Sequence, residues 1–214
     1  MREKSFNWST TFKSILILED ELFHNTYDVK LAIEPITKDL SEQSKYFERL
    51  KSLYTYVFAN AIVAYREEKL YKILETSTSN RFIELPKPPY DQVMSAVCFR
   101  KSNAILEGKI IVKNVELSSY QGDGISYTVD SDSIELELLN IDNWFSNKYN
   151  SFNPWWLRAD TATYDKELAK GIYTGHFSWD FDSISTIEKK NTDNHAKVFE
   201  FNPRIIDGGK NKNK

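Results

Sequence analysis

The stretch SILILEDELFHNTYDVKLAIEP, residues 14–35, decides the fold. Its first part, residues 14–18, is a short and largely apolar run, which is typical of a central strand. Apolar and polar side chains then alternate from Tyr27 to Ile33, as in a strand with one buried face, and Pro35 ends the alternation. Residues 24–26, His-Asn-Thr, have turn chemistry. The two runs therefore predict an antiparallel hairpin with its turn at residues 24–26.

Two helices are predicted after this hairpin. Asp39 and Glu42 have the spacing of a helix capping box, and the apolar residues that follow recur at steps of three and four. We therefore expect a helix over about residues 40–63. A proline-rich segment then excludes helix, after which a second helix is expected to begin at Asp91, a plausible N-cap, and to end near Gly108.

Three further strands are predicted over residues 110–117, 125–129 and 134–138, while residues 64–85 are ambiguous apart from a short strand at 81–85. The order ββααβββ indicates an α+β fold, in which two helices pack on one face of an antiparallel sheet, followed by an aromatic-rich irregular C-terminal segment. The expected organisation is a two-layer α+β core domain over residues 1–140, a C-terminal extension packed on that core over 141–206, and a disordered tail over 207–214.

The composition argues against several classes of protein. The 28 basic and 31 acidic side chains give a net charge of −3, so no nucleic-acid or anionic-membrane partner is indicated. Cys98 is the single cysteine, which excludes an internal disulfide. The polar N-terminus does not resemble a secretory signal, and no apolar run is long enough to span a membrane, so a cytoplasmic protein is expected. The 21 lysines and 16 asparagines suit an accessory protein of a phage or other mobile element.

No catalytic or metal-binding motif is found, which favours a non-enzymatic protein without a cofactor. His24, His176 and His195 fall in three different segments without the spacing of zinc ligands. Cys98 lies on the apolar face of the second predicted helix, where a thiol is unreactive. Residues 118–124, Ser-Ser-Tyr-Gln-Gly-Asp-Gly, are best explained as a loop between two strands, with an anion or ligand contact as the alternative.

The main candidate for function is a cluster of aromatic side chains after residue 141. Tryptophan, tyrosine and arginine are enriched at protein interfaces. The predicted interface comprises Trp144, Tyr149, Trp155, Trp156 and Arg158. Because Trp155 and Trp156 are adjacent, their side chains point in different directions, so one can anchor in the core while the other contacts a partner. The cluster could instead seal the core, or stack on bases or sugars.

Two functions are considered. The leading hypothesis is a non-enzymatic binding or assembly protein that contacts a protein partner or itself. The alternative is a ligand-pocket protein or enzyme that binds a nucleotide, purine or pterin at a helix–sheet edge or a subunit interface. It rests on the order ββααββ over about residues 11–130, which resembles that of the tunnelling fold, whose members bind purines and pterins. The chain lacks the three metal-ligand histidines of the pterin-forming members of that fold. The candidate ligand residues are Lys101, Asn103, Glu107 and Glu116.

Overall fold

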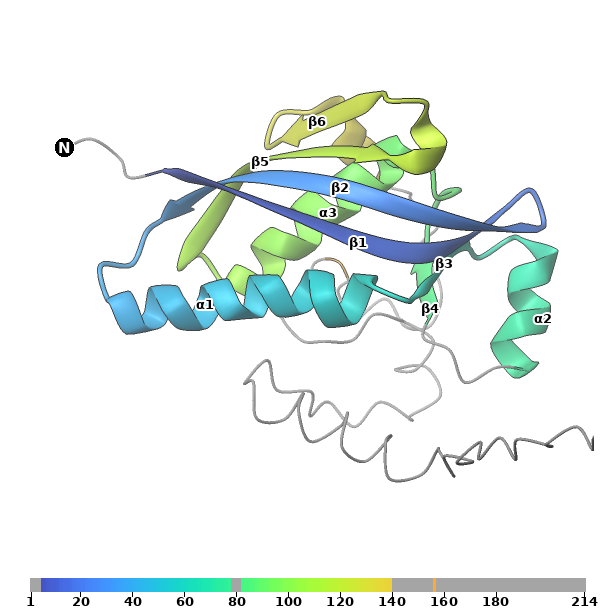
Figure 1. Cartoon of the computed structure of the whole chain (residues 1–214), viewed down its shortest axis with the longest axis horizontal. Coiled ribbons are helices and arrows are strands. Elements are labelled where there is room, and N and C mark those ends of the chain that lie inside the picture. Colours follow the sequence, from blue (N-terminus) through green and yellow to red (C-terminus); the bar gives the residue numbers. More distant parts are fainter. Residues whose placement is uncertain (1–4, 78–81, 140–155, 157–214) are drawn as a thin grey trace, which may run out of the picture.

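The computed structural model describes residues 5–77 and 82–139, together with Trp156. Its strands form a six-stranded sheet in the order β4-β3-β1-β2-β5-β6 (Figure 1). The strands are β1 (Phe6–Leu18), β2 (Glu21–Pro35), β3 (Ile62–Tyr65), β4 (Phe82–Leu85), β5 (Ile110–Ser119) and β6 (Ser126–Asp130). The helices are α1 (Leu40–Ser52), α2 (Lys69–Ser77) and α3 (Asp91–Leu106). Three short helical segments are also present: the π-helical η1 (Leu53–Phe58) and the 3₁₀ segments η2 (Tyr120–Gly122) and η3 (Ile134–Leu139). The predicted α+β class is confirmed.

The predicted hairpin is present, but its turn was placed wrongly. β1 pairs with β2 along its whole length, and the turn consists of Glu19 and Asp20, whose φ angles are 54° and 61°. Two consecutive residues in the left-handed conformation form a type I′ turn, whose twist matches that of the flanking strands. Residues 24–26, predicted as the turn, lie inside β2 and pair with residues 13–15 of β1.

The hairpin turn is held by contacts with the start of α2. The carboxylate of Glu68 accepts hydrogen bonds from the backbone N–H groups of Glu19, at 3.2 Å, and Asp20, at 2.9 Å. In return, the Asp20 carboxylate accepts the N–H groups of Lys69, at 2.6 Å, and Leu70, at 3.0 Å, in the first turn of α2. The N–H group of Leu70 is the largest influence that lowers the pKa of Asp20. These four bonds stabilise a turn that contains no glycine or asparagine.

The first helix is shorter than predicted, and the sheet is mixed, not antiparallel. Asp39 is the N-cap of α1, as predicted, and its side chain accepts the N–H of Ser41 at 2.8 Å. After Ser52 the chain continues as the π-helical segment η1 and then enters β3, which runs parallel to β1. β4 in turn runs parallel to β3, and the predicted short strand at 81–85 corresponds to β4.

The last predicted strand is a 3₁₀ helix. In η3 the buried residues are Leu136 and Leu139, three positions apart, whereas Ile134 is 72% exposed. Apolar residues at every second position therefore misled the prediction. The observed element order differs from ββααββ, so the resemblance to the tunnelling fold is not supported. The predicted regions 141–206 and 207–214 lie outside the described residues, except for Trp156.

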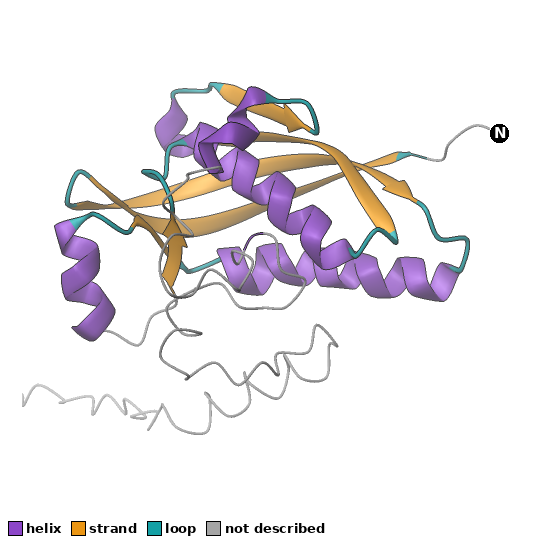
Figure 2. Cartoon of the chain, turned by 180° about the vertical axis from the view of Figure 1, so that it is seen from behind, coloured by secondary structure: helices purple, strands orange, loops and turns teal. Residues whose placement is uncertain are grey.

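Two helices cover one face of the sheet, and a third covers part of the other. Figure 2 shows α1 and α3 lying on the same side of the sheet, where the main hydrophobic core forms. α2 packs on the opposite face, where Tyr71 contacts a small cluster with Ile17 and Phe82. Among the described residues, no helix is both long and apolar enough to cross a membrane.

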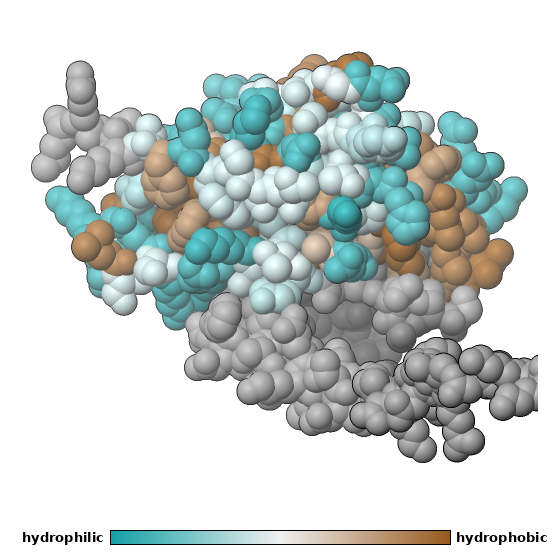
Figure 3. Space-filling model, viewed as in Figure 1, coloured by the Kyte–Doolittle hydropathy of each residue, from teal (hydrophilic) through white to brown (hydrophobic). Residues whose placement is uncertain are grey.

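The rest of the second sheet face is polar. Thr11 donates a hydrogen bond to Asp28 at 2.6 Å, and Lys30 forms an ion pair with Glu116 at 2.8 Å. Figure 3, in the same view as Figure 1, shows mostly hydrophilic surface here, with hydrophobic surface over α2. The alternation in β2 is therefore explained by one face in the core and one in solvent.

The stripe on α1 gives the first prediction. Leu50 is completely buried, whereas Leu40 on the same helix is 77% exposed. We expect Leu50→Ala to lower the free energy of unfolding by about 2–5 kcal/mol, because it removes buried methyl groups and leaves a cavity. Leu40→Ala is the matched control and should change the urea midpoint little. Equal midpoints for the two variants would mean that α1 does not face the core.

Candidate functional site

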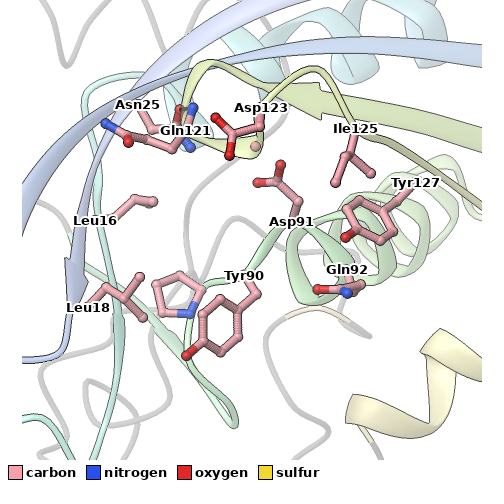
Figure 4. Close-up of a pocket in the computed structure, with 12 residues that line it drawn as sticks. Leu16, Leu18, Asn25, Tyr90, Asp91, Gln92, Gln121, Asp123, Ile125 and Tyr127 are labelled. Atoms are coloured by element: carbon pink, nitrogen blue, oxygen red, sulfur yellow. Dashed lines mark hydrogen bonds between the residues drawn. The ribbon is translucent and has the colours of Figure 1, made fainter.

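A pocket of about 280 Å³ opens at the N-terminus of α3. Its walls come from the end of β1, the middle of β2, the loop between β5 and β6, and the start of β6. Figure 4 shows Asp91 near the centre, Asn25, Gln121 and Asp123 together on one side of it, and apolar side chains on the flanks. Segments far apart in the sequence thus meet around one carboxylate.

The sheet supplies a polar floor beside this pocket. Asn25 and Tyr27 lie two residues apart on β2 and therefore share the helix-covered face, and Tyr27 pairs with Ser119 of β5. Asn25 is only 2% exposed, and its Oδ1 accepts the N–H groups of Thr26, at 2.9 Å, and Gln121, at 3.2 Å. Its Nδ2 atom and the Tyr27 hydroxyl are buried and make no hydrogen bond of good geometry, although the Asn25 side chain lies close enough to lower the pKa of the Tyr27 hydroxyl. A buried donor left unpaired costs free energy, so these two atoms need an explanation.

Asp91 faces this floor from the helix. It was predicted to be the N-cap, but Tyr90 takes that position without a side-chain cap, and Asp91 is the first helical residue. Its Oδ2 accepts a hydrogen bond from Ser119 Oγ at 2.8 Å. A Cβ atom on Gly122 would lie 2.3 Å from the same Oδ2. The loop can therefore approach the carboxylate this closely because position 122 is glycine.

The pocket is acidic. Asp91 and Asp123 both line it, and no lysine, arginine or histidine is among its described lining residues. Burial raises the pKa of Asp91, although the hydrogen bond from Ser119 acts in the opposite direction. Burial also raises the pKa of Tyr27; the side chain of Asn25 acts in the opposite direction, and the nearby charge of Asp91 adds to the increase. A positively charged group with hydrogen-bond donors would complement the two carboxylates.

The loop over residues 118–124 forms one wall of the pocket, but not as an anion site. Its Tyr120–Gly122 segment is a 3₁₀ turn, and Asp123 and Gly124 follow with φ angles of 50° and 78°. This geometry places Asp123 in the same pocket as Asp91. Two carboxylates repel an anion, so the alternative of an anion contact is disfavoured. Within residues 5–77 and 82–139, no group of three or more histidine, cysteine, aspartate or glutamate side chains could hold a metal ion.

The predicted ligand residues are distributed among separate contacts. Lys101 is completely buried. The Asn103 amide bonds to both the N–H and the C=O of Val112, each at 3.0 Å, along a part of β5 that β6 does not reach. Glu107 accepts hydrogen bonds from Tyr46, at 2.8 Å, and Arg49, at 3.1 Å, whereas Glu116 pairs with Lys30 on the outer face. Of the four residues, only Asn103 lines a second pocket, of about 410 Å³, beside Arg100 and Lys113.

The predicted aromatic interface falls mostly outside the described residues, which include only Trp156 of its five members; Trp144, Tyr149, Trp155 and Arg158 are not among them. Trp156 is 2% exposed and belongs to the main core cluster. The interface therefore stays a prediction. His24 lies in β2, and His176 and His195 are outside the described residues.

Cys98 is completely buried, as predicted, and burial raises the pKa of its thiol to about 12. A thiol with so high a pKa is protonated at neutral pH and is a poor nucleophile. Its environment therefore supports a packing role.

Sequence reasoning named the loop over residues 118–124 as a possible ligand contact, but it missed the other polar residues that meet in the pocket. Asn25 was assigned to a turn because asparagine is rare in strands, and Asp91 was assigned to a helix cap. The signal in the sequence was that asparagine is rare in strands. A polar residue on the buried face of an alternating strand indicates a functional site more strongly than an apolar residue does.

Comparisons with known proteins give no family. No protein-family model matches the chain, and no curated protein matches it. Among solved structures, one match is the crystal structure of an uncharacterized protein, WS1659, from Wolinella succinogenes. It has 10% sequence identity and a TM-score of 0.45, and the match covers 60% of this chain and 98% of that chain.

The burial of Trp156 gives the second prediction. Trp156→Ala should lower the free energy of unfolding by about 3–5 kcal/mol, because a large side chain leaves the core. If the predicted interface exists, Trp155→Ala should leave the unfolding midpoint nearly unchanged and weaken self-association. Urea unfolding and sedimentation measure the two effects. If Trp155→Ala unfolds the protein as readily as Trp156→Ala and leaves association unchanged, the interface prediction is wrong.

The pKa of Asp91 gives the third prediction. Because it is raised above 3.8, the native state binds more protons than the unfolded state between pH 3.8 and the folded pKa. Stability from this group therefore falls as pH rises through that window, and at pH 7 the buried charge is unfavourable. Asp91→Asn should be at least as stable as the wild type at pH 7, with the difference shrinking as the pH falls below about 3.8.

Urea midpoints at several pH values test this expectation. Asp132→Asn is a suitable control because Asp132 is exposed in the turn after β6. A loss of stability in Asp91→Asn at pH 7 would show that the carboxylate is stabilising.

Proposed function

We propose that this chain is a binding protein whose pocket at the N-terminus of α3 receives an arginine side chain from a partner protein. The observation that carries the proposal is the combination of two carboxylates, Asp91 and Asp123, with the buried Nδ2 of Asn25, which makes no hydrogen bond of good geometry.

The charges favour a cationic ligand. Asp91 is half-buried, and this burial raises its pKa. No basic residue among the described lining residues of the pocket compensates its charge. A cation beside it would restore the electrostatic compensation that water supplies in an open site. The unpaired Nδ2 of Asn25 is a donor and needs an acceptor, which a simple cation does not offer. A partner protein offers both, since it carries cationic side chains and also carbonyl and hydroxyl oxygens that accept hydrogen bonds.

The walls favour arginine over lysine. Leu16 and Pro89 supply apolar surface for an aliphatic stem, and Tyr90 and Tyr127 supply aromatic rings. A guanidinium group stacks on aromatic rings and bonds to carboxylates through two parallel N–H groups, whereas an ammonium group is a compact point charge.

The surroundings favour a protein as the bearer of this arginine. Two large apolar side chains that line the pocket are exposed: Tyr90 is 48% exposed and Ile125 54%. Tyr120, which precedes the lining residue Gln121 in the chain, is 81% exposed. Exposed aromatic and aliphatic side chains around a polar depression are typical of protein interfaces. A partner would cover this surface while its arginine occupies the pocket.

The fourth prediction tests this function with a minimal probe, N-acetyl-arginine-N′-methylamide, titrated into isotope-labelled protein and followed by NMR. We expect chemical-shift changes at the pocket residues and at least about tenfold weaker binding to Asp91→Asn, because the neutral amide loses the charge-assisted hydrogen bonds. The corresponding citrulline compound has the same shape without the charge and should not bind.

Two protein variants sharpen the result. Asp132→Asn removes an exposed carboxylate outside the pocket and should bind like the wild type. Gly122→Ala keeps both carboxylates but forces Asp91 Oδ2 to move, since the new Cβ would lie 2.3 Å from it, and should weaken binding. Equal binding of the arginine and citrulline compounds, or undiminished binding by Asp91→Asn, would refute the proposal.

A further inference from the structure

We propose that the partner segment binds as an extended strand added antiparallel to β6, with its arginine opposite Tyr127. This inference rests on the proposed function, which assigns the arginine to the pocket. It names the form in which the partner presents that residue.

β6 is the outermost strand at one end of the described sheet and pairs with β5 alone (Figure 1). Its backbone direction follows from Asp130, whose N–H donates to Ser133 Oγ at 2.9 Å and whose C=O accepts the N–H of Ser133 at 3.4 Å. Both groups of Asp130 therefore face away from β5. Because alternate residues of a strand direct their backbone groups to the same side, those of Thr128 and Ser126 also face outward.

The opposite edge of the sheet is less suitable. All four residues of β4 are buried, and the strand is followed at once by Pro86. In β6, by contrast, Ser126 and Thr128 are both exposed. A strand with exposed backbone groups can accept another strand, the mode known as β-augmentation.

The pocket lies beside this edge. Ile125 and Tyr127 both line it, and Figure 4 shows them on the same side of Asp91. A residue opposite Tyr127 in an added strand would project its side chain to the same sheet face as Tyr127. Neighbouring strands lie about 4.8 Å apart, so a long side chain at that position extends over Tyr127 toward the carboxylates. The two residues that flank it would exchange backbone hydrogen bonds with Ser126 and Thr128.

The test uses the probe acetyl-Val-Thr-Arg-Thr-Val-amide. We expect it to bind at least about tenfold more tightly than N-acetyl-arginine-N′-methylamide, because it adds backbone hydrogen bonds and apolar contact beside Ile125. N-methylation of the two threonines, whose N–H groups would bond to β6, should remove this gain. N-methylation of the arginine, whose N–H would face away from β6, should leave the affinity unchanged.

A protein variant provides an independent measurement. Thr128→Pro removes the outward N–H of β6, and proline is tolerated on an edge strand at such a position. This variant should bind the arginine compound like the wild type and lose the additional affinity for the pentapeptide. Its unfolding midpoint serves as the control for folding, and the N-methylated peptides test the same bonds on unaltered protein.

The outcomes separate this inference from the proposed function. If the arginine compound binds but the pentapeptide binds no tighter, strand addition is wrong and the arginine pocket stands. The same conclusion follows if both N-methylation patterns weaken binding equally or neither does. If the arginine compound itself fails to bind, the proposed function is refuted together with this inference.

Discussion

The antiparallel pairing of β1 with β2 determines where every other element lies. Its register runs from Phe6 opposite Ile33 to Leu18 opposite Glu21. β3 adds to the free side of β1, and β5 adds to the free side of β2. A slip of one residue would turn each side chain of β2 to the opposite face of the sheet. The register that buries Val29, Leu31 and Ile33 therefore also directs Asn25 and Tyr27 to the helix-covered face, where the pocket forms.

The parts of the fold that could be predicted are those encoded by neighbouring residues. Alternation over residues 27–33 indicated β2, and the side chain of Asp39 marked the start of α1. The hairpin turn could not be read in this way, because Glu19 and Asp20 are held in left-handed conformations by Glu68, which lies 48 or 49 positions away. The first two residues of β3 were taken for the end of a helix and the next two were left ambiguous, since a short buried apolar run has no periodicity that distinguishes strand from helix.

The candidate site was harder to predict than the fold because its members are distant in sequence and ordinary one by one. Asn25 and Gln121 are 96 positions apart, and the hydrogen bond between them exists only once β2 and the β5–β6 loop are in place. Asp91 and Ser119 meet in the same way. Each of these residue types has a common local explanation, as a turn, a cap or a loop residue. In the folded chain these residues surround one pocket, and no local sequence pattern indicates that they do.

Satisfied polar groups elsewhere in the interior strengthen the case for this pocket. Ser14 donates to the Phe58 carbonyl at 2.8 Å, and the hydroxyls of Tyr54 and Ser102 lie 3.0 Å apart. In the described structure, unpaired buried side-chain atoms are restricted to Asn25, Tyr27 and the Nε of Arg49, and the Nη1 of Arg49 does bond to Glu107. Two of the three exceptions therefore adjoin Asp91, whose pKa burial raises even though the positive end of α3 favours a charge there. Apolar residues at these positions would remove the cost of unpaired polar atoms and of a buried charge. A stable fold alone does not require such an arrangement, whereas a site that receives a positive charge from a partner does.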